Sequence, residues 1–342
     1  MKFDYYFPNL PPTAAPEAAR RAARIGYDGF FTAETSHEPF LSGCLASHAE
    51  PELEVGTSIT LAFPRSPMVM AQLAWDMQLV AGGKFLLGLG TQIRPHITRR
   101  FSTEWSRPTA RLRDYIGALR AVWDCFQNGT RLRYQGEFYQ LTLMTPFFNP
   151  GPNQMPEIPV YIAGVGPMLS RLAGEVCAGF HVHPFHTVRY LDCVVLPAIE
   201  EGAHQAGRSL EDVAVTAPVF VITGRDRKEM EDSIRAAKEQ IAFYASTPSY
   251  APVLDSHGWD FGPTLTAMTR RGEWQKMADV IPDEVVREVA VVAPVSELAE
   301  RIVSRYSGRL RRVGIYSMAG DAILTEEEWT RLAAEIRDFS SR

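Results

Sequence analysis

The chain has 342 residues and a net charge of −5, and 46% of its residues are hydrophobic. A chain of this length buries about three quarters of its unfolded surface, so it needs no disulfide or metal for stability. The negative charge argues against a general nucleic-acid binder, which usually carries a basic face. Asp4 and Pro8 interrupt the segment where a signal peptide needs an apolar run, and the apolar stretch Val289–Val295 is far too short to span a membrane. We therefore expect a soluble, cytoplasmic protein that binds neither nucleic acid nor membrane.

Neither the histidines nor the cysteines form a strong metal-binding motif. His181 and His183 would point to one face of a strand, with His186 close behind, but no nearby carboxylate completes a ligand set. We expect no metal site, and His183 lines a cofactor pocket or is a satisfied core histidine. The cysteines show no CxxC spacing and are expected to be reduced thiols: Cys44, Cys125, Cys177 and Cys193.

From the N-terminus, short apolar runs alternate with longer amphipathic runs, which predicts parallel strands joined by covering helices. The predicted strands are Lys2–Phe7, Tyr27–Thr32, Glu54–Leu61, Phe85–Leu89, Pro159–Ala163, Gly179–His183, Val213–Ile222 and Val313–Ser317. The predicted helices are Ala14–Ile25, Pro67–Ala81, Pro108–Phe126, Met168–Cys177, Leu191–Ala206, Lys228–Ala245 and Glu326–Phe339. Eight strand–helix units predict an α/β protein, a (β/α)8 TIM barrel that forms one domain over residues 1–342.

Some segments do not fit the eight units and are predicted insertions, after strands three or four and after strand seven. They cover about residues 91–107, 131–157 and 247–283. Apolar and polar residues alternate over Leu132–Leu143 around Gln135 and Gly136, which predicts a small hairpin. The last insertion has a less regular pattern, and we expect it to cover the mouth of the barrel.

A barrel of this kind carries its active site at the C-terminal ends of its strands. Gly88 and Gly90 close the fourth strand and Thr91 follows, but Ile93 stands where a dinucleotide-binding fingerprint needs its third glycine. The motif is therefore not a Rossmann signal. It marks either a strand end where a flat group can approach the backbone or a site of tight packing.

A glycine-rich segment between the fifth strand and its helix contains Ala163, Gly164, Val165, Gly166 and Pro167. Free N–H groups at a helix start bind phosphate, glycines permit close approach, and proline suits the first helical turn. No Walker lysine follows, so hydrolysis of a nucleoside triphosphate is not predicted. We favour a phosphate cradle, and an ordinary loop is the alternative.

Arginines gather in the first insertion and at the start of the helix after it. Arginine at a helix start opposes the helix dipole, which favours an anionic partner such as an acidic ligand tail over a merely solvated surface. These residues are Arg94, Arg99, Arg100, Arg107, Arg111 and Arg113.

Several motifs, most of them at strand ends, occur in order across nearly the whole chain: Gly56–Thr60, Arg65–Pro67, Ala71–Gln72, Gly83–Phe85, Gly88–Thr91, Pro159–Pro167 and Arg312–Tyr316. They resemble those of the luciferase-like monooxygenase superfamily, and in particular its branch that uses the deazaflavin coenzyme F420. The resemblance implies a barrel oxidoreductase that forms homodimers or homotetramers.

The resemblance also implies how the cofactor is held. A non-prolyl cis peptide would map to Ser58 and Ile59, behind the central ring of the cofactor. The loop Ala163–Pro167 would bind the phosphate. Other contacts to the cofactor would come from residues that follow the strands: Thr35, Leu61, Thr91, His96 and His183.

The sequence departs from the family where proton transfer is concerned. Sugar-phosphate dehydrogenases of the F420 branch place a histidine and a glutamate where this chain has Ser36 and Ile93. We therefore do not expect activity on glucose 6-phosphate. His37, one residue further on, and Glu34 are the candidates for catalytic proton transfer.

These features favour an F420-dependent enzyme that transfers a hydride between the deazaflavin and an unidentified organic substrate. Aromatic side chains after the strands, such as Phe63 and Phe185, indicate an apolar substrate pocket. One alternative is an FMN-dependent monooxygenase that uses O2 and reduced flavin supplied by a separate reductase. Another is a non-catalytic binding protein or unrelated chemistry on the same barrel.

Overall fold

Parallel strands close into a barrel, as the alternation of apolar runs predicts. The structure is a computed structural model that describes residues 1–341. Within these residues eight parallel strands follow one another around the barrel, and the last pairs with the first. In barrel order they are β1 (Lys2–Tyr6), β2 (Gly29–Thr32), β3 (Glu54–Thr57), β5 (Phe85–Gly90), β8 (Val160–Gly164), β9 (Gly179–Val182), β10 (Ala214–Ile222) and β12 (Arg312–Tyr316).

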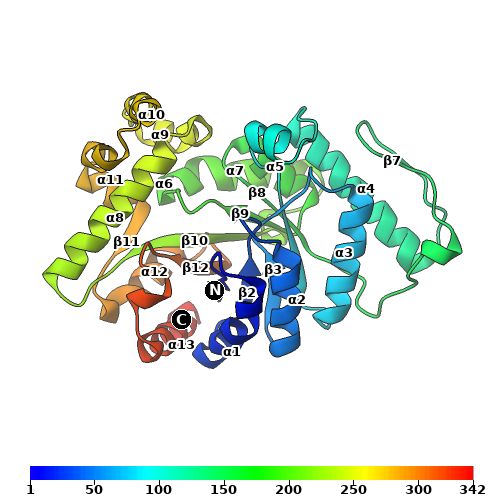
Figure 1. Cartoon of the computed structure of the whole chain (residues 1–342), viewed down its shortest axis with the longest axis horizontal. Helices are drawn as coiled ribbons and strands as arrows, with labels where there is room; N and C mark the ends of the chain where they lie inside the picture. The colour runs from blue at the N-terminus through cyan, green and yellow to red at the C-terminus, as the bar shows by residue number, and fades with distance from the viewer. Residues whose placement is uncertain (342) are drawn as a thin grey trace.

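Helices cover the outside of the barrel (Figure 1). Side-chain caps fix where several of them begin, because Glu38, Ser66 and Asp226 each accept a hydrogen bond from a first-turn N–H group. The covering helices are α1 (Ala15–Ile25), α2 (Pro39–Ala49), α3 (Pro67–Val80), α4 (Pro108–Asn128), α5 (Pro167–Val176), α7 (Leu196–Gln205), α8 (Arg227–Ala245), α12 (Leu298–Tyr306) and α13 (Glu326–Ser340).

The first two insertions leave the barrel in different ways. Residues 91–107 contain a single π-helical turn, His96–Arg100. The predicted hairpin is present but short, with β6 (Tyr134–Gln135) paired to β7 (Gln140–Leu141). Figure 1 shows it extending away from the barrel beyond α4.

The third insertion is more regular than the sequence indicates. It folds into α9 (Ala251–His257), α10 (Gly262–Arg271) and a 3₁₀ helix, Trp274–Val280, before α11 (Asp283–Val289). Its α9 packs on α6 (Val188–Tyr190), which follows β9, so this segment borders the mouth of the barrel.

The structure adds elements that the sequence analysis missed. Helix α2 is apolar nearly all round and shows no helical stripe, whereas α12 does carry one that was overlooked. Strand β11 (Ala290–Val292), which was also missed, pairs with the end of β10. The predicted strand Glu54–Leu61 is present but is divided into β3 and β4 (Thr60–Leu61), and β4 pairs with β5. None of the helices within residues 1–341 is both long and apolar enough to cross a membrane.

An ion cluster closes the base of the barrel. The buried Arg312 guanidinium donates two hydrogen bonds to the carboxylate of the buried Asp4, at 2.7 and 2.8 Å, and also pairs with Glu54. Above it, the aromatic and aliphatic side chains of Phe31, Leu86 and Tyr161 fill the barrel interior. The base is therefore sealed, and the opposite ends of the strands remain as the place for a site.

Candidate functional site

The peptide bond between Ser58 and Ile59 is cis, so this prediction is confirmed. It lies between β3 and β4, where the strand bends, and both side chains are half-buried. The bend is tied to the end of β2 on both sides. The Ser58 N–H donates to the Thr32 carbonyl at 2.7 Å, and the Glu34 N–H donates to the Ile59 carbonyl at 2.9 Å.

Glu34 holds the residues that follow the cis peptide. Its Oε2 atom accepts hydrogen bonds from Thr60 Oγ1 at 2.9 Å, Leu61 N at 2.8 Å and Arg65 at 2.7 Å. The side chain is only 8% exposed. These bonds describe a positioning residue, while the catalytic role that the sequence analysis gave to Glu34 stays a prediction.

The two glycines of β5 make room for this bent segment. A Cβ atom on Gly88 would lie 1.9 Å from the Thr57 carbonyl oxygen, and one on Gly90 would lie 2.4 Å from the Ile59 side chain. Tight packing is therefore the reason for both glycines. Thr91, which follows them, is half-buried at the mouth, and its hydroxyl donates to the Gln92 carbonyl at 3.2 Å.

The glycine loop after β8 has the properties of a phosphate cradle. Gly166 is the residue before α5 and offers no side chain to cap the helix, so the first-turn N–H groups have no side-chain cap. A Cβ atom on Gly166 would meet nothing within 4 Å, which shows that the space in front of the helix is open. Such a helix start binds an anion such as phosphate. The Tyr190 hydroxyl donates to the Val165 carbonyl and anchors the loop from behind.

The residues after β2 form the rim of the mouth. The hydroxyl groups of Thr35 and Ser36 donate to Asn9 Oδ1 at 2.8 and 2.7 Å. The Arg100 guanidinium donates to the Thr35 carbonyl at 2.5 Å and so ties the first insertion to this rim. His37 is half-buried and lines a small cavity of about 80 Å³ together with Asn9 and Thr35.

The arginine cluster divides into bound and free members. Arg107 pairs with Glu137 and Arg113 with Glu175, while Arg111 donates to the Glu104 carbonyl and stacks on an aromatic ring. Arg94 and Arg99 form no ion pair with any residue in the range 1–341, and both are exposed. Exposed His96 lies between them, at the start of the π-helical turn.

The histidines of the H-x-H motif lie at different depths and do not form a metal site. Buried His181 lies under the cis peptide, with Nδ1 3.5 Å from Ser58 Oγ, and burial lowers its pKa to about 3. His183 lies higher, where β9 ends, against tyrosine rings. No group of three histidine, cysteine or carboxylate side chains among residues 1–341 could hold a metal ion.

A tyrosine wall at the mouth was missed by the sequence analysis. We use this name for Tyr244, Tyr250 and Tyr316, which lie close to His183. The Tyr244 and Tyr316 hydroxyl oxygens are 2.6 Å apart, and Tyr250 Oη is 3.0 Å from His183 Nε2. Tyr316 is the last residue of β12, so its position at a strand end could have marked it as a site residue from the sequence. Tyr250 lies in the third insertion, whose packing sequence does not reveal.

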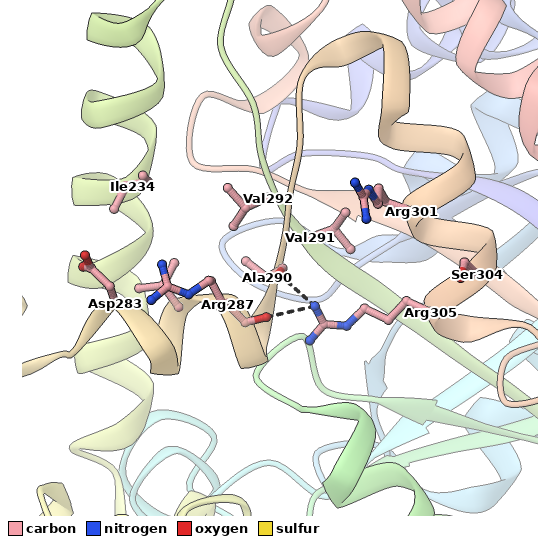
Figure 2. A pocket seen from close by; sticks show the side chains of 10 residues that line it. Ile234, Asp283, Arg287, Ala290, Val291, Val292, Arg301, Ser304 and Arg305 are labelled. Carbon is pink, nitrogen blue, oxygen red and sulfur yellow. Dashed lines mark hydrogen bonds between the residues drawn. The ribbon is translucent and has the colours of Figure 1, made fainter.

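A separate groove of about 500 Å³ lies between α8, α11, β11 and α12 (Figure 2). Its arginines serve the fold. Arg305 donates to the carbonyls of Arg287 and Ala290, at 3.0 and 2.9 Å, as the dashed lines of Figure 2 show. Capping of the last carbonyls of a helix by arginine is a common way to end it, and the groove is not part of the site at the mouth.

The fold and the site together fit the class of (β/α)8-barrel oxidoreductases that use a flavin or a deazaflavin. The chain belongs to the luciferase-like monooxygenase family, whose model matches residues 4–312. An uncharacterized protein of Mycobacterium tuberculosis is 44% identical over 92% of each chain. The F420-dependent glucose-6-phosphate dehydrogenase of Amycolatopsis mediterranei is 26% identical, over 85% of this chain and 84% of its own.

Solved structures share the fold. The coenzyme F420-dependent tetrahydromethanopterin reductase of Methanopyrus kandleri superposes with a TM-score of 0.79 at 19% identity, covering 98% of both chains. Further matches include both F420-dependent and FMN-bound proteins, so the comparisons support a deazaflavin or a flavin as the cofactor. The open, uncapped start of α5 and the bent wall at Ser58–Ile59 fit either cofactor, because both carry a flat ring system and a phosphate.

Proposed function

We propose that the protein is an F420-dependent oxidoreductase that transfers a hydride between the deazaflavin and an apolar organic substrate. The observation that carries this proposal is the open, uncapped helix start at Gly166, which lies two strands around the barrel from the bent segment Ser58–Leu61. The helix start provides backbone donors for a phosphate, and the bent segment provides a backing for a flat ring. The relation to an F420-dependent dehydrogenase over most of the chain supports it.

Each part of the site has a defined task in this proposal. Gly164–Pro167 bind the phosphate through backbone N–H groups, and Glu34 keeps Leu61 and Ile59 in place behind the ring. The tyrosine wall forms an aromatic surface that excludes water from the reacting face. When bound, the deazaflavin supplies the hydride chemistry, and the protein contributes position and a dry environment.

The two free arginines favour the deazaflavin over FMN. F420 carries an acidic oligoglutamate tail, and Arg94 and Arg99 offer unpaired guanidinium groups beside the mouth for charge-assisted bonds. FMN has no such tail and would leave both arginines without a function.

The test is a fluorescence titration of the apoprotein with F420 and with FMN in parallel. We expect tight binding of F420 and weak binding of FMN, and a tenfold loss of F420 affinity in the double variant Arg94→Ala/Arg99→Ala. Tight binding of FMN without binding of F420 would overturn the proposal and favour a flavin monooxygenase served by a separate reductase. Binding of neither would favour a protein without this redox function.

The remaining site residues keep the roles that the sequence analysis gave them, as proposals. We propose that Thr35, Thr91 and His96 contact the ring system or its side chain and that His37 takes part in proton transfer at the rim. His37 is the candidate because its half-buried ring lines a cavity next to Thr35. A His37→Gln variant that binds F420 normally and keeps full activity at every pH would remove His37 from the mechanism.

We also propose that the protein forms a homodimer through α2 and α3, which pack side by side on the barrel (Figure 1). Both helices are apolar nearly all round, which is typical of helices covered on every side. They nevertheless expose large apolar side chains in this chain. Light scattering should give twice the monomer mass, and Leu41→Lys/Leu79→Lys should give monomers. The exposed residues are Leu41, Leu45, Val69, Leu79 and Val80.

A further inference from the structure

The tyrosine wall faces the cis peptide across the mouth of the barrel. Around the barrel, three strands separate β3 from β10 in either direction, so the two lie opposite each other. The cis peptide follows β3, while His183 and Tyr316 stand at the ends of β9 and β12, the neighbours of β10. A flat ring that rests on Ser58–Ile59 therefore turns its free face toward the tyrosine wall. A substrate between the two contacts the tyrosines.

The hydrogen bonds of His183 define which of its ring nitrogens carries a proton. The backbone N–H of Phe185 donates to His183 Nδ1 at 3.1 Å, so Nδ1 presents a lone pair. Burial, together with the nearby His186, lowers the pKa of His183 to about 3, so the ring is neutral at pH 7. A neutral imidazole carries one N–H, which must then be at Nε2.

The polarity of the bond to Tyr250 follows from this tautomer. Because His183 Nε2 carries the proton, it donates to the Tyr250 hydroxyl oxygen at 3.0 Å. The Tyr250 O–H must then point away from His183. Within residues 1–341 no protein group accepts from this O–H, so Tyr250 has a donor left to offer, and His183 fixes its direction. The neighbouring Tyr244 and Tyr316 hydroxyls share one hydrogen bond at 2.6 Å, in which one of them donates to the other.

We infer that the Tyr250 hydroxyl binds the oxygen atom of a ketone or secondary alcohol substrate, with His183 as the positioning residue that orients it. This inference rests on the proposed function and adds the substrate class. The Tyr250 hydroxyl is a neutral donor that lies among the aromatic rings of Phe185 and Tyr244. Such a donor suits a single uncharged oxygen on an otherwise apolar molecule. A phosphate or carboxylate substrate would find no cation in this wall.

The reduction then balances as follows. The hydride from the bound deazaflavin forms a C–H bond at the carbonyl carbon, and the π electrons of the C=O bond move to oxygen. That oxygen takes the proton of Tyr250, because an alkoxide is a stronger base than a phenolate. The His183 Nε2–H donates to the phenolate, which regains a proton from solvent. The substrate is reduced and the coenzyme oxidised by two electrons, and oxidation of the alcohol runs the same steps in reverse.

The first experiment observes the tautomer without any turnover. Two-dimensional ¹⁵N NMR of protein labelled on histidine, with His183→Gln to assign the signals, separates protonated from unprotonated ring nitrogens. We expect Nε2 protonated and Nδ1 unprotonated at pH 7. A protonated Nδ1 would reverse the bond to Tyr250 and overturn the inference.

The second experiment measures reduction of cyclohexanone and acetophenone by reduced F420, with F420 affinity and thermal stability measured on every variant. We expect Tyr250→Phe to lower kcat about 100-fold with unchanged F420 affinity, in the range of a lost general acid or oxyanion donor. His183→Leu should cost about tenfold, and His183→Gln, whose amide nitrogen can replace Nε2–H, should recover most of it. The double variant His183→Leu/Tyr250→Phe should have the same kcat as Tyr250→Phe alone, because His183 acts through Tyr250. The control Tyr134→Phe removes a hydroxyl in the distant hairpin that is bonded to Asp114 of α4, and it should leave kcat and F420 affinity unchanged.

The outcomes separate the inference from the proposed function. Failure to bind F420 would refute the proposed function itself. Two results, each with normal F420 binding, would overturn the inference alone. The first is a fully active Tyr250→Phe variant. The second is a protein that neither reduces either ketone nor oxidises cyclohexanol.

Discussion

The carboxylate of Glu34 and the guanidinium of Arg65 lie 2.7 Å apart beneath the mouth of the barrel, with side chains only 8% and 16% exposed. The same carboxylate oxygen holds Leu61, directly after the cis peptide segment. Removing one member of a buried pair leaves an uncompensated charge and costs about 3–5 kcal/mol. We expect Arg65→Met, which leaves Glu34 unpaired, to lower the free energy of unfolding by about this amount in urea denaturation. Glu34→Ala should cost less, because Arg65 keeps its second partner Glu38 at 3.4 Å.

The exposed pair Glu17–Arg20 is a suitable control for this first prediction, because its side chains are 70% and 51% exposed. Exposed pairs contribute about 0–1 kcal/mol. Glu17→Ala should therefore leave stability nearly unchanged. Equal losses at Glu34 and Glu17 would contradict the role assigned to the buried pair.

Two glycine substitutions should have opposite effects. At Gly166 a Cβ meets no atom within 4 Å, so Gly166→Ala should fold with a loss below about 1 kcal/mol and yet weaken coenzyme binding about tenfold, because the methyl group intrudes on the phosphate. At Gly88 a Cβ would lie 1.9 Å from backbone, so Gly88→Ala should destabilise the fold by several kcal/mol. Melting temperature and coenzyme titration measure both effects. Unchanged coenzyme affinity in Gly166→Ala would remove the phosphate from this loop.

Removing one member of the ion cluster at the barrel base should lower the free energy of unfolding more than removing both members of its central pair. Burial raises the pKa of Asp4 although Arg312 lowers it, so the carboxylate depends on its partner for its charge. We expect Arg312→Met to destabilise the protein by about 3–5 kcal/mol. The double variant Asp4→Leu/Arg312→Met should be more stable than Arg312→Met, as measured by denaturant unfolding. A double variant less stable than Arg312→Met would contradict the cost assigned to the unpaired Asp4 carboxylate.

Stability should fall as the pH decreases from about 6.5 toward 4. Burial lowers the pKa of His181 and of His183 to about 3 and that of His186 to about 4, from 6.5 in the unfolded chain. In this range the unfolded state binds more protons than the native state, so unfolding becomes more favourable as the pH decreases. Three such groups give a slope of up to about 4 kcal/mol per pH unit. Urea unfolding at pH 7, 6 and 5 measures it, and His186→Leu should reduce the slope by about a third.

Much of the fold could be predicted because most barrel strands are short, largely apolar runs. Phe85–Leu89 is one example, and the structure extends it by a single residue to Gly90. Helix α2 could not be predicted from periodicity, since Phe40, Leu41 and Leu45 spread apolar surface around it. Strand β11 has three residues, which is too short for a pattern to be distinct from chance.

The site was less accessible to sequence. The position of the cis peptide came from the family resemblance, because no propensity distinguishes Ser58–Ile59 from an ordinary strand end. The supporting role of Glu34 became visible only from the three donors that converge on its carboxylate in the structure. The tyrosine wall and the adjacent His183 come from segments around residues 183, 244–250 and 316, and only the closure of the barrel brings these segments together.

The two walls of the mouth come from different halves of the chain. In the proposed function, the segments that hold the coenzyme, Ser58–Leu61 and Gly164–Pro167, lie before residue 168, and the tyrosine wall and His183 lie after residue 182. Evolution can therefore replace the second half, residue by residue or through new insertions, while the redox partner stays the same. A lineage of such proteins would therefore change its substrates while it keeps the same coenzyme.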